Sequence, residues 1–287
     1  MITGKTRLAG IIATPIKHSF SPLIHNTAFQ ELGIDAVYLA FDTLPKNFEQ
    51  AIGSISALNL LGVNLSMPYK KGALKYMDSL GTEVKLIQAM NTIVCRNSRL
   101  IGRNTDGIGY IESLRSKGIS IREEKVTILG AGGAGLAVIA QMALEGMRKI
   151  SVFNRKSVNF CPLHKRLKEL SYQTKVKIEL FDLADEKALK KELSTSRILA
   201  NMTNVGMGEM SWASPIRNPQ VIPENILVTD AIYVPRETKL LQQAKSRGAQ
   251  TMNGLGMLLH QAAVSFNLWT GRKMPIEIIE KKMEEEV

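Results

Sequence analysis

A glycine-rich segment between an apolar run and a helical pattern is the feature of this 287-residue chain that most restricts its fold. Gly130, Gly132 and Gly135 form the pattern G-x-G-x-x-G directly after the apolar run 125–129, and the stretch 134–146 that follows is rich in small residues. Glycine permits a tight turn and lets backbone amides at a helix N-terminus approach a pyrophosphate. Because a strand precedes and a helix follows, the segment predicts a dinucleotide-binding Rossmann unit rather than a glycine turn without a ligand.

The end of the next expected strand, 150–153, bears on which dinucleotide is bound. An acidic residue there would bond the ribose of NAD, whereas cations would accommodate the 2′-phosphate of NADP. No Asp or Glu occurs in residues 146–168, and Arg155 and Lys156 lie at the expected position. A guanidinium can bond a phosphate through two parallel hydrogen bonds. We therefore expect NADP, with NAD as the alternative and two ordinary surface cations as the simpler explanation.

Apolar runs alternate with helical patterns along the whole chain, which is typical of β-α-β units. The expected strands span 8–13, 36–41, 61–65, 125–129, 150–153, 176–181, 197–200 and 226–229, with a further β-rich stretch at 92–103. The pattern predicts an α/β fold with two domains. We expect a discontinuous substrate-binding domain of residues 1–106 plus 253–287, which ends in returning helices, and a Rossmann domain of residues 107–252 with a parallel sheet.

Composition restricts the class of protein. The net charge of +11 would suit an acidic partner. Basic residues are interleaved with acidic ones, as in 185–193, so we expect an anionic small substrate and cofactor and no nucleic acid. No stretch reaches the ~20 apolar residues of a membrane span. Two cysteines, Cys95 and Cys161, and four histidines form no metal-binding spacing, so the sequence predicts a cytoplasmic protein without a metal site.

Polar residues gather in four segments outside the glycine turn. These segments are 18–22, 64–70, 90–92 and 104–107. Each follows an apolar strand-like run, and ligands bind beyond the carboxyl ends of strands in open α/β sheets. These segments could therefore converge on one site, which spacing alone does not establish.

Lys70 and Asp106 are the titratable residues of most interest in those segments. Lys70 follows Pro68 and is expected in the first turn of a helix, and Asp106 is expected to begin another. A helix N-terminus favours a carboxylate and the neutral form of an amine, so the two groups together could exchange a proton with a substrate alcohol. On spacing alone, an N-cap aspartate and a surface lysine are the simpler interpretation.

Together the segments resemble the shikimate dehydrogenase family over essentially the whole chain, and its quinate/shikimate branch in particular. The motifs that carry the resemblance stand in the family's order: 19-SFSP, 64-NLSMPYK, 89-AMNT, 104-NTDG, 130-GAGGAG, 230-DAIYVP and 254-GLGMLLHQAA.

The resemblance implies roles for individual residues. Lys70 and Asp106 would be the catalytic pair, in which the lysine exchanges a proton with the ring oxygen of the substrate. The substrate would be bound by Ser19, Ser21, Ser66, Asn91, Tyr233 and Gln261. The cofactor would be bound by Gly130, Ala131, Gly132, Gly133, Ala134, Gly135, Asn154, Arg155, Lys156, Thr203 and Gly254.

The implied reaction is reversible, NADP-dependent hydride transfer between shikimate and 3-dehydroshikimate, with quinate as a further substrate. NAD-accepting relatives of the quinate branch typically carry Asp where this chain has Ser157, and Lys156 replaces the Thr that is usual in NADP-binding members. An NAD-linked quinate dehydrogenase is the nearer alternative. A non-catalytic dinucleotide or metabolite sensor on the same fold is the more distant one. The expected partner is the small acid, and a homodimer is left open.

Overall fold

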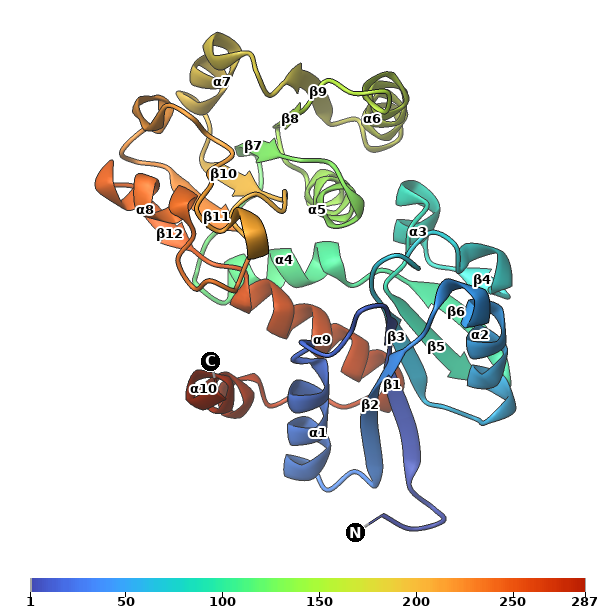
Figure 1. The fold of residues 1–287 in the computed structure, drawn as a ribbon. Coiled ribbons are helices and arrows are strands. Elements are labelled where there is room, and N and C mark those ends of the chain that lie inside the picture. The colour runs from blue at the N-terminus through green and yellow to red at the C-terminus, as the bar shows by residue number, and fades with distance from the viewer. Residues whose placement is uncertain (1, 287) are drawn as a thin grey trace. The chain divides into compact units, whose positions relative to one another are not determined.

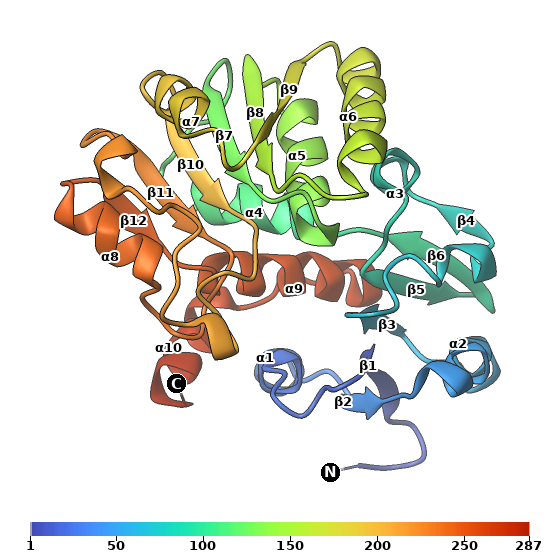
Figure 2. The same cartoon turned by 45° about the horizontal axis from the view of Figure 1, so that its top comes forward.

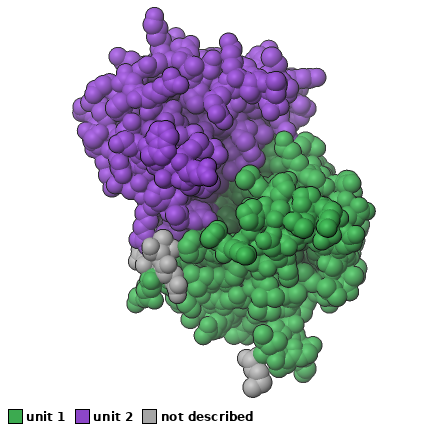
Figure 3. Space-filling model, viewed as in Figure 1, with its two compact units in different colours: residues 1–109, 258–287 green, residues 110–257 purple. Residues whose placement is uncertain are grey.

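The computed structural model describes residues 2–286, which form two compact units (Figure 3). Unit 1 comprises Met1–Gly109 and Leu258–Val287, and unit 2 comprises Tyr110–Met257. The α/β fold class expected from the sequence is confirmed. The assignment of substrate to residues 1–106 plus 253–287 and of cofactor to residues 107–252 stays a prediction.

Unit 1 contains a mixed six-stranded sheet in the order β2-β1-β3-β5-β6-β4 (Figure 1). Its strands are β1 (Arg7–Ala13), β2 (Ala36–Asp42), β3 (Gly62–Leu65), β4 (Ser79–Leu80), β5 (Thr92–Arg96) and β6 (Arg99–Arg103). β1 runs parallel to β2 and β3, whereas β5 is antiparallel to both β3 and β6. The β-rich stretch 92–103 is a hairpin whose two loop residues, Asn97 and Ser98, have positive φ angles, as a tight two-residue turn requires.

Several helices lie entirely within unit 1. They are α1 (Ser21–Glu31), α2 (Phe48–Ala57), α3 (Thr82–Ile87) and α10 (Ile276–Glu286), with the short 3₁₀ helices η1 (Pro45–Asn47) and η2 (Leu74–Tyr76). The boundaries between the two units fall within α4 (Asp106–Arg115) and α9 (Leu255–Thr270). Helix α1 begins at Ser21 with Pro22 in its first turn, and its N-cap is Phe20.

The helix expected after Pro68 is absent, and this corrects the prediction for Lys70. Residues 68–73 form consecutive turns, followed by η2. The backbone carbonyl of Lys70 accepts a hydrogen bond of 2.8 Å from the amide of Met90, a residue distant in sequence. That carbonyl is therefore used between segments and not within a helix.

Unit 2 is built on a six-stranded sheet in the order β12-β11-β10-β7-β8-β9, in which all paired strands are parallel (Figure 2). Its strands are β7 (Lys125–Leu129), β8 (Lys149–Asn154), β9 (Lys177–Asp182), β10 (Ile198–Asn201), β11 (Leu227–Asp230) and β12 (Gln250–Met252). The order reverses at β7, with β8 on one side and β10 on the other. This reversal is the position at which doubly wound sheets bind nucleotides.

Four helices lie entirely within unit 2. They are α5 (Gly133–Leu144), α6 (Phe160–Thr174), α7 (Glu186–Leu193) and α8 (Lys239–Ser246), with the 3₁₀ helices η3 (Gly208–Met210) and η4 (Pro219–Val221). α5 packs against α6, and α7 packs against η4. Most of α5 is buried, which explains the small residues that the sequence places there. Within residues 2–286, no helix combines the length and the apolar character needed to span a bilayer.

A largely buried cluster of ion pairs lies at the amino ends of β7 and β8. The carboxylate of Glu192 lies 2.8 Å from the ammonium groups of both Lys125 and Lys149, and Ser151 donates a hydrogen bond to it. Burial opposes the charge of Glu192, but the hydrogen bonds from the lysines and Ser151 outweigh it and lower the pKa to about 2. Charged groups at this end of the sheet are thus paired with one another.

Candidate active site

Lys70 and Asp106 are in direct contact within unit 1. The Lys70 Nζ lies 2.6 Å from Asp106 Oδ2, and the two side chains are 22% and 9% exposed. Lys70 comes from the turn after β3, and Asp106 is the first residue of α4. The structure therefore brings together two residues that lie 36 positions apart in the sequence.

Asn91 fixes the other oxygen of Asp106. Its Nδ2 donates to Asp106 Oδ1 over 2.7 Å and to Thr105 Oγ1 over 3.0 Å. The amide of Thr105 donates in return to Asn91 Oδ1 over 2.8 Å. Both carboxylate oxygens of Asp106 thus accept a hydrogen bond, which sets the orientation of the carboxylate beside the lysine.

A layer of buried hydroxyl and amide groups lies behind this pair. Asn64 Nδ2 donates to Thr92 Oγ1 and to Ser265 Oγ, each over 3.1 Å, and its Oδ1 accepts from the hydroxyl of Tyr38 over 2.7 Å. Thr92 Oγ1 in turn donates to Asn91 Oδ1 over 3.0 Å. All of these side chains are buried. We call Tyr38, Asn64, Thr92 and Ser265 the polar layer.

The polar layer has consequences for ionisation and order. Burial raises the pKa of Tyr38 well above its usual value, although a hydrogen bond with Ser21 acts in the opposite direction. Tyr38 is therefore a neutral hydroxyl at physiological pH. A continuous chain of hydrogen bonds runs from it through Asn64, Thr92 and Asn91 to Asp106. Such a network holds each member in one geometry, because a broken bond would leave a buried polar group unsatisfied.

The other predicted substrate-binding residues of unit 1 lie near these groups to differing degrees. Gln261 Oε1 accepts a hydrogen bond of 3.4 Å from Thr105, the neighbour of Asp106. The α9 backbone approaches closely there, since a Cβ on Gly109 would lie 2.5 Å from the Gln261 amide. Ser66 is held at the carboxyl end of β3, where its amide donates to Ile12 of β1. Within residues 2–286, the Ser66 side chain forms no hydrogen bond with Lys70 or Asp106.

Ser19 and Ser21 are placed together at the start of α1. The Ser21 amide donates to Ser19 Oγ over 3.3 Å, and Ser21 is buried whereas Ser19 is half-exposed. Tyr233, the remaining predicted substrate residue, lies in unit 2 after β11, where burial raises the pKa of its phenol. Its expected association with the two serines stays a prediction.

The glycine turn of unit 2 has the geometry that its sequence indicates. Gly130 has a φ of +89°, a backbone conformation that favours glycine. A Cβ on Gly135 would lie 2.4 Å from the Gly130 carbonyl oxygen. Gly132 is the N-cap of α5 and provides no side-chain cap, and Gly133 and Ala134 form the first turn of that helix. The helix start therefore presents backbone amides that no capping side chain covers, as a pyrophosphate requires.

The remaining predicted cofactor residues follow neighbouring strands at the same edge. The Thr203 methyl would lie 2.7 Å from a Cβ on Gly130, so the residue after β10 packs on the glycine turn. Asn154 ends β8, and its Oδ1 accepts a hydrogen bond of 3.4 Å from the Ala131 amide. Gly254 packs on the end of β11, where a Cβ would lie 2.1 Å from the carbonyl oxygen of Ala231.

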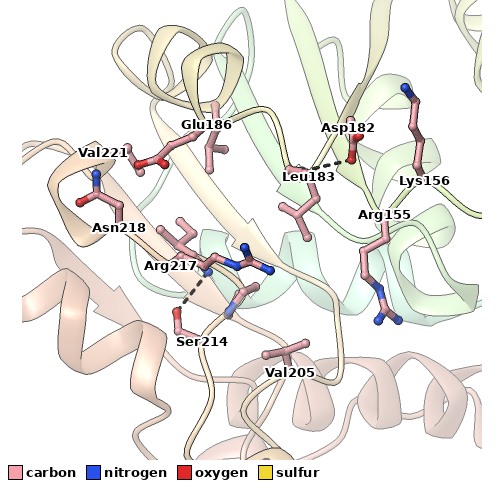
Figure 4. A pocket seen from close by; sticks show the side chains of 14 residues that line it. Arg155, Lys156, Asp182, Leu183, Glu186, Val205, Ser214, Arg217, Asn218 and Val221 are labelled. Carbon is pink, nitrogen blue, oxygen red and sulfur yellow. Dashed lines mark hydrogen bonds between the residues drawn. The ribbon is translucent and has the colours of Figure 1, made fainter.

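Arg155 and Lys156 line a pocket of about 520 Å³ beside these residues (Figure 4). Both side chains are exposed. The uncapped start of α5 and these cations together fit a dinucleotide that carries an additional phosphate. Among residues 2–286, no group of three or more His, Cys, Asp or Glu side chains is arranged to hold a metal ion.

Several residues of the two sites were not singled out from the sequence. Thr92 and Thr105 stand inside the motifs 89-AMNT and 104-NTDG, so those motifs contained a signal for them. Ser265 lies one helical turn after Gln261 and could have been found from that spacing. Tyr38, in an otherwise apolar strand, had no distinguishing signal.

Comparison with known proteins gives consistent relatives. Residues 11–93 match the family model of the shikimate dehydrogenase substrate binding domain, and residues 254–284 match that of the shikimate 5'-dehydrogenase C-terminal domain. A protein of Lactococcus lactis subsp. cremoris named shikimate dehydrogenase (NADP(+)) is 46% identical over 286 residues, which cover 100% of this chain and 99% of the relative.

Solved structures extend the comparison to three dimensions. The 1.45 Å crystal structure of shikimate 5-dehydrogenase from Listeria monocytogenes, in complex with shikimate and NAD, is 41% identical. It has a TM-score of 0.95 and covers 98% of both chains. Quinate dehydrogenase from Corynebacterium glutamicum in complex with NAD has a TM-score of 0.87 and covers 98% of this chain and 99% of its own, at 23% identity. That identity supports a likeness in fold alone.

Proposed function

Because the chain belongs to the shikimate dehydrogenase family, we propose that it catalyses reversible, NADP-dependent hydride transfer between shikimate and 3-dehydroshikimate. The observation that carries the proposal is the 2.6 Å contact between Lys70 and Asp106, which is held by Asn91. The relatives that are 42% to 46% identical are named for shikimate and NADP, whereas the quinate enzyme resembles this chain in fold alone. Shikimate is therefore the principal substrate, and quinate is a further one to be tested.

Lys70 would exchange the proton of the reaction. In the oxidation of shikimate, the neutral amine takes the proton of the ring hydroxyl while the ring carbon loses a hydride, and a carbonyl forms. In the reverse direction, the ammonium returns the proton to the carbonyl oxygen. Asp106 holds the Lys70 Nζ at 2.6 Å and thereby directs it. The hydride would pass to or from the nicotinamide and the proton to or from Lys70, so charge and electrons balance.

The remaining polar residues would bind and orient the substrate. Asn91 already donates to Asp106, and Gln261 accepts from Thr105, so their amides are held where ring hydroxyls could bond them. We assign Ser66 to the same task. The hydroxyls of Ser19 and Ser21, with Tyr233, would bind the carboxylate through several hydrogen bonds in place of one ion pair.

The cofactor residues would bind the dinucleotide at the edge of unit 2. The backbone amides at the start of α5 would bond the pyrophosphate, and Arg155 and Lys156 would bond the 2′-phosphate. Thr203, Asn154 and Gly254 would bound the site through the packing described above. When bound, the nicotinamide accepts or supplies the hydride. The Listeria relative was solved with NAD, so NAD is the alternative cofactor to be compared.

The test is a set of parallel assays with two acids and two cofactors. Shikimate or quinate is combined with NADP or NAD, and formation of the reduced nicotinamide is followed by absorbance. We expect kcat/KM to be largest for shikimate with NADP. Turnover with quinate and NAD alone would replace the proposal by the nearer alternative. No turnover with any pair, together with salt-sensitive retention on DNA, would indicate a non-catalytic sensor.

We further propose a cytoplasmic location, because both cysteines, Cys95 and Cys161, are free thiols. A homodimer stays a prediction.

A further inference from the structure

The pocket beside Arg155 contains a cation that the proposed function does not use. The pocket begins where β8 and β9 end, since Asn154 and Asp182 are paired as the last residues of these strands. Asn154 also contacts the glycine turn through the amide of Ala131. In a Rossmann domain this position lies next to the adenosine ribose of the cofactor. Arg217, from the loop between η3 and η4, lines the same pocket.

Three cations line this pocket without pairing to protein acids. They are Arg155, Lys156 and Arg217, and all three are exposed. Across residues 2–286, no hydrogen bond or ion pair of their side chains is found. Elsewhere in unit 2, by contrast, Arg115 is paired with Glu112 and Glu145, and Lys149 with Glu192. The pocket therefore retains positive groups that are free to bind a ligand.

Two acidic residues line the pocket as well, and each has a local structural explanation. Asp182 Oδ1 accepts a hydrogen bond of 3.1 Å from the amide of Ala184, as the last residue of a strand that enters a turn (Figure 4). Glu186 lies in the first turn of α7, where the helix dipole favours a carboxylate. Neither carboxylate forms an ion pair with the three cations.

The segment that carries Arg217 is held on both sides. Ile216, immediately before it, is buried in the core of unit 2. Ser214 Oγ donates to Gln243 Oε1 over 2.6 Å and accepts from the Ile216 amide over 3.2 Å. Asn218, immediately after Arg217, caps η4 by accepting a hydrogen bond from the Gln220 amide. The backbone of Arg217 is thus anchored, and only its side chain has freedom to adjust.

The side chain of Arg217 points into the pocket (Figure 4). Figure 4 shows the guanidinium of Arg217 extending from the 214–218 segment into the pocket, while Arg155 enters from the end of β8. The two guanidiniums thus come from different elements of unit 2. A phosphate dianion offers three oxygens, so it can be bonded by guanidiniums from two sides.

We propose that Arg217 is a specificity-determining residue of the cofactor site, which bonds the 2′-phosphate of NADP across the pocket from Arg155. The inference rests on the proposed NADP-dependent function and adds to it a residue that lies outside the loop after β8. NAD lacks the 2′-phosphate, so Arg217 contributes to the choice of NADP without contributing equally to binding of the rest of the dinucleotide. Free phosphate bears the same chemistry but lacks the adenosine.

The experiment compares two probes that differ by the 2′-phosphate. Adenosine 2′,5′-bisphosphate and adenosine 5′-monophosphate are titrated calorimetrically into the full-length wild type, Arg217→Ala, Arg217→Lys and Arg148→Ala. Arg148 is a matched control because it is an exposed arginine just before the amino end of β8. KM for NADP and for NAD is measured on the same proteins with shikimate. Thermal melting shows whether each variant is folded.

We expect Arg217→Ala to weaken binding of the bisphosphate about tenfold, which corresponds to about 1.4 kcal/mol, and to leave the monophosphate within about twofold. KM for NADP should rise by a similar factor and KM for NAD should not. Arg217→Lys should fall between wild type and Arg217→Ala, because it keeps the charge but loses the fork of donors. Arg148→Ala should match the wild type.

Four outcomes would overturn the inference, and they distinguish its failure from a failure of the proposed function. If folded Arg217→Ala keeps the wild-type preference for the bisphosphate, Arg217 has no such role, while the function stands. The same conclusion follows if both probes weaken equally. If the wild type itself binds both probes alike, the inference falls together with the NADP preference, and turnover of shikimate decides the reaction separately. Tight binding of inorganic phosphate that competes equally with both adenosine probes would also contradict it.

Discussion

The polar groups of the two units are organised in opposite ways. In unit 1, Lys70, Asp106 and Asn91 are bonded to one another and supported by the buried polar layer. In unit 2, Arg155, Lys156 and Arg217 are exposed around a pocket and unpaired within the described chain. A proton-transfer pair needs fixed geometry, which buried hydrogen bonds provide. A phosphate site needs charge that stays free until the ligand arrives, which exposed cations provide at a low desolvation cost.

The largest effect is expected where the pair of Lys70 and Asp106 is itself broken. Lys70→Ala should lower kcat about a thousandfold, because it removes the group that exchanges the proton. KM for NADP should stay within about twofold of wild type. Steady-state kinetics with shikimate and NADP measure both quantities. Lys71→Ala is the matched control, since Lys71 is the exposed neighbour of Lys70. A Lys70→Ala enzyme with wild-type kcat would remove this residue from the mechanism.

The second prediction concerns His25, a polar residue that is buried in unit 1 without a hydrogen-bond partner. His25 is fully buried, and neither ring nitrogen has a hydrogen-bond partner. It stacks on Tyr38 with 4.3 Å between ring centroids, and burial lowers its pKa to about 3. In the unfolded chain the pKa is near 6.5, so between these values the unfolded state binds a proton that the folded state does not.

The contribution of His25 to stability is therefore fully present above about pH 6.5 and is lost as the pH falls towards 3. Below about pH 6.5 the free energy of unfolding falls by about 1.4 kcal/mol for each pH unit, so about 3 kcal/mol is lost between pH 7 and pH 4. His25→Phe should abolish this loss while keeping the ring contacts, as measured by urea unfolding at several pH values. His164→Phe, at an exposed position, should keep the wild-type slope. Equal slopes for His25→Phe and wild type would contradict the prediction.

The third prediction tests whether the polar layer acts on the pair. Thr92→Val removes the hydroxyl that bonds Asn91 and Asn64 and keeps the shape of the side chain. We expect kcat to fall about fivefold and the free energy of unfolding to fall by about 1 to 2 kcal/mol. Thr127→Val is matched in burial and in having a hydroxyl partner, but it lies in unit 2. It should cost similar stability and leave kcat unchanged; equal kcat losses in both variants would indicate a general structural effect.

The smallest expected effect is that of salt. Raising the ionic strength from about 0.05 to 0.2 M should raise KM for NADP about two- to threefold, because the cations of the unit 2 pocket are exposed to screening. KM for shikimate and kcat should change less, because Lys70 and Asp106 are mostly buried and bonded to each other. Steady-state kinetics at several salt concentrations measure all three quantities. Equal salt sensitivity of both KM values would remove the contrast between the two regions.

Local patterns predicted much of the architecture. The expected strand 125–129 coincides with β7, and the expected strands 36–41 and 150–153 lie within β2 and β8. The turn at Gly130 could be recognised because only glycine tolerates its backbone angle and the approach of Gly135. The prediction of a helix after Pro68 was wrong, because the Lys70 carbonyl accepts a hydrogen bond from the Met90 amide and not from an amide within a helix.

The polar segments of the sequence and the family resemblance both indicate Lys70 and Asp106, but neither indicates the residues that surround them. Tyr38 and Ser265 lie 26 and 201 positions from Asn64, and no local pattern records such a pairing. Arg217 was likewise indistinguishable from other surface arginines until the fold brought its loop to the end of β8.

By itself, the sequence determined the α/β class, the dinucleotide turn and the identity of the residues available for chemistry, because these depend on periodicity and on the steric properties of single residues. Only the tertiary structure decided which of those residues are bonded, buried or free. Hydrogen bonding and desolvation act over a few ångströms in space, between segments that the chain separates by tens or hundreds of residues.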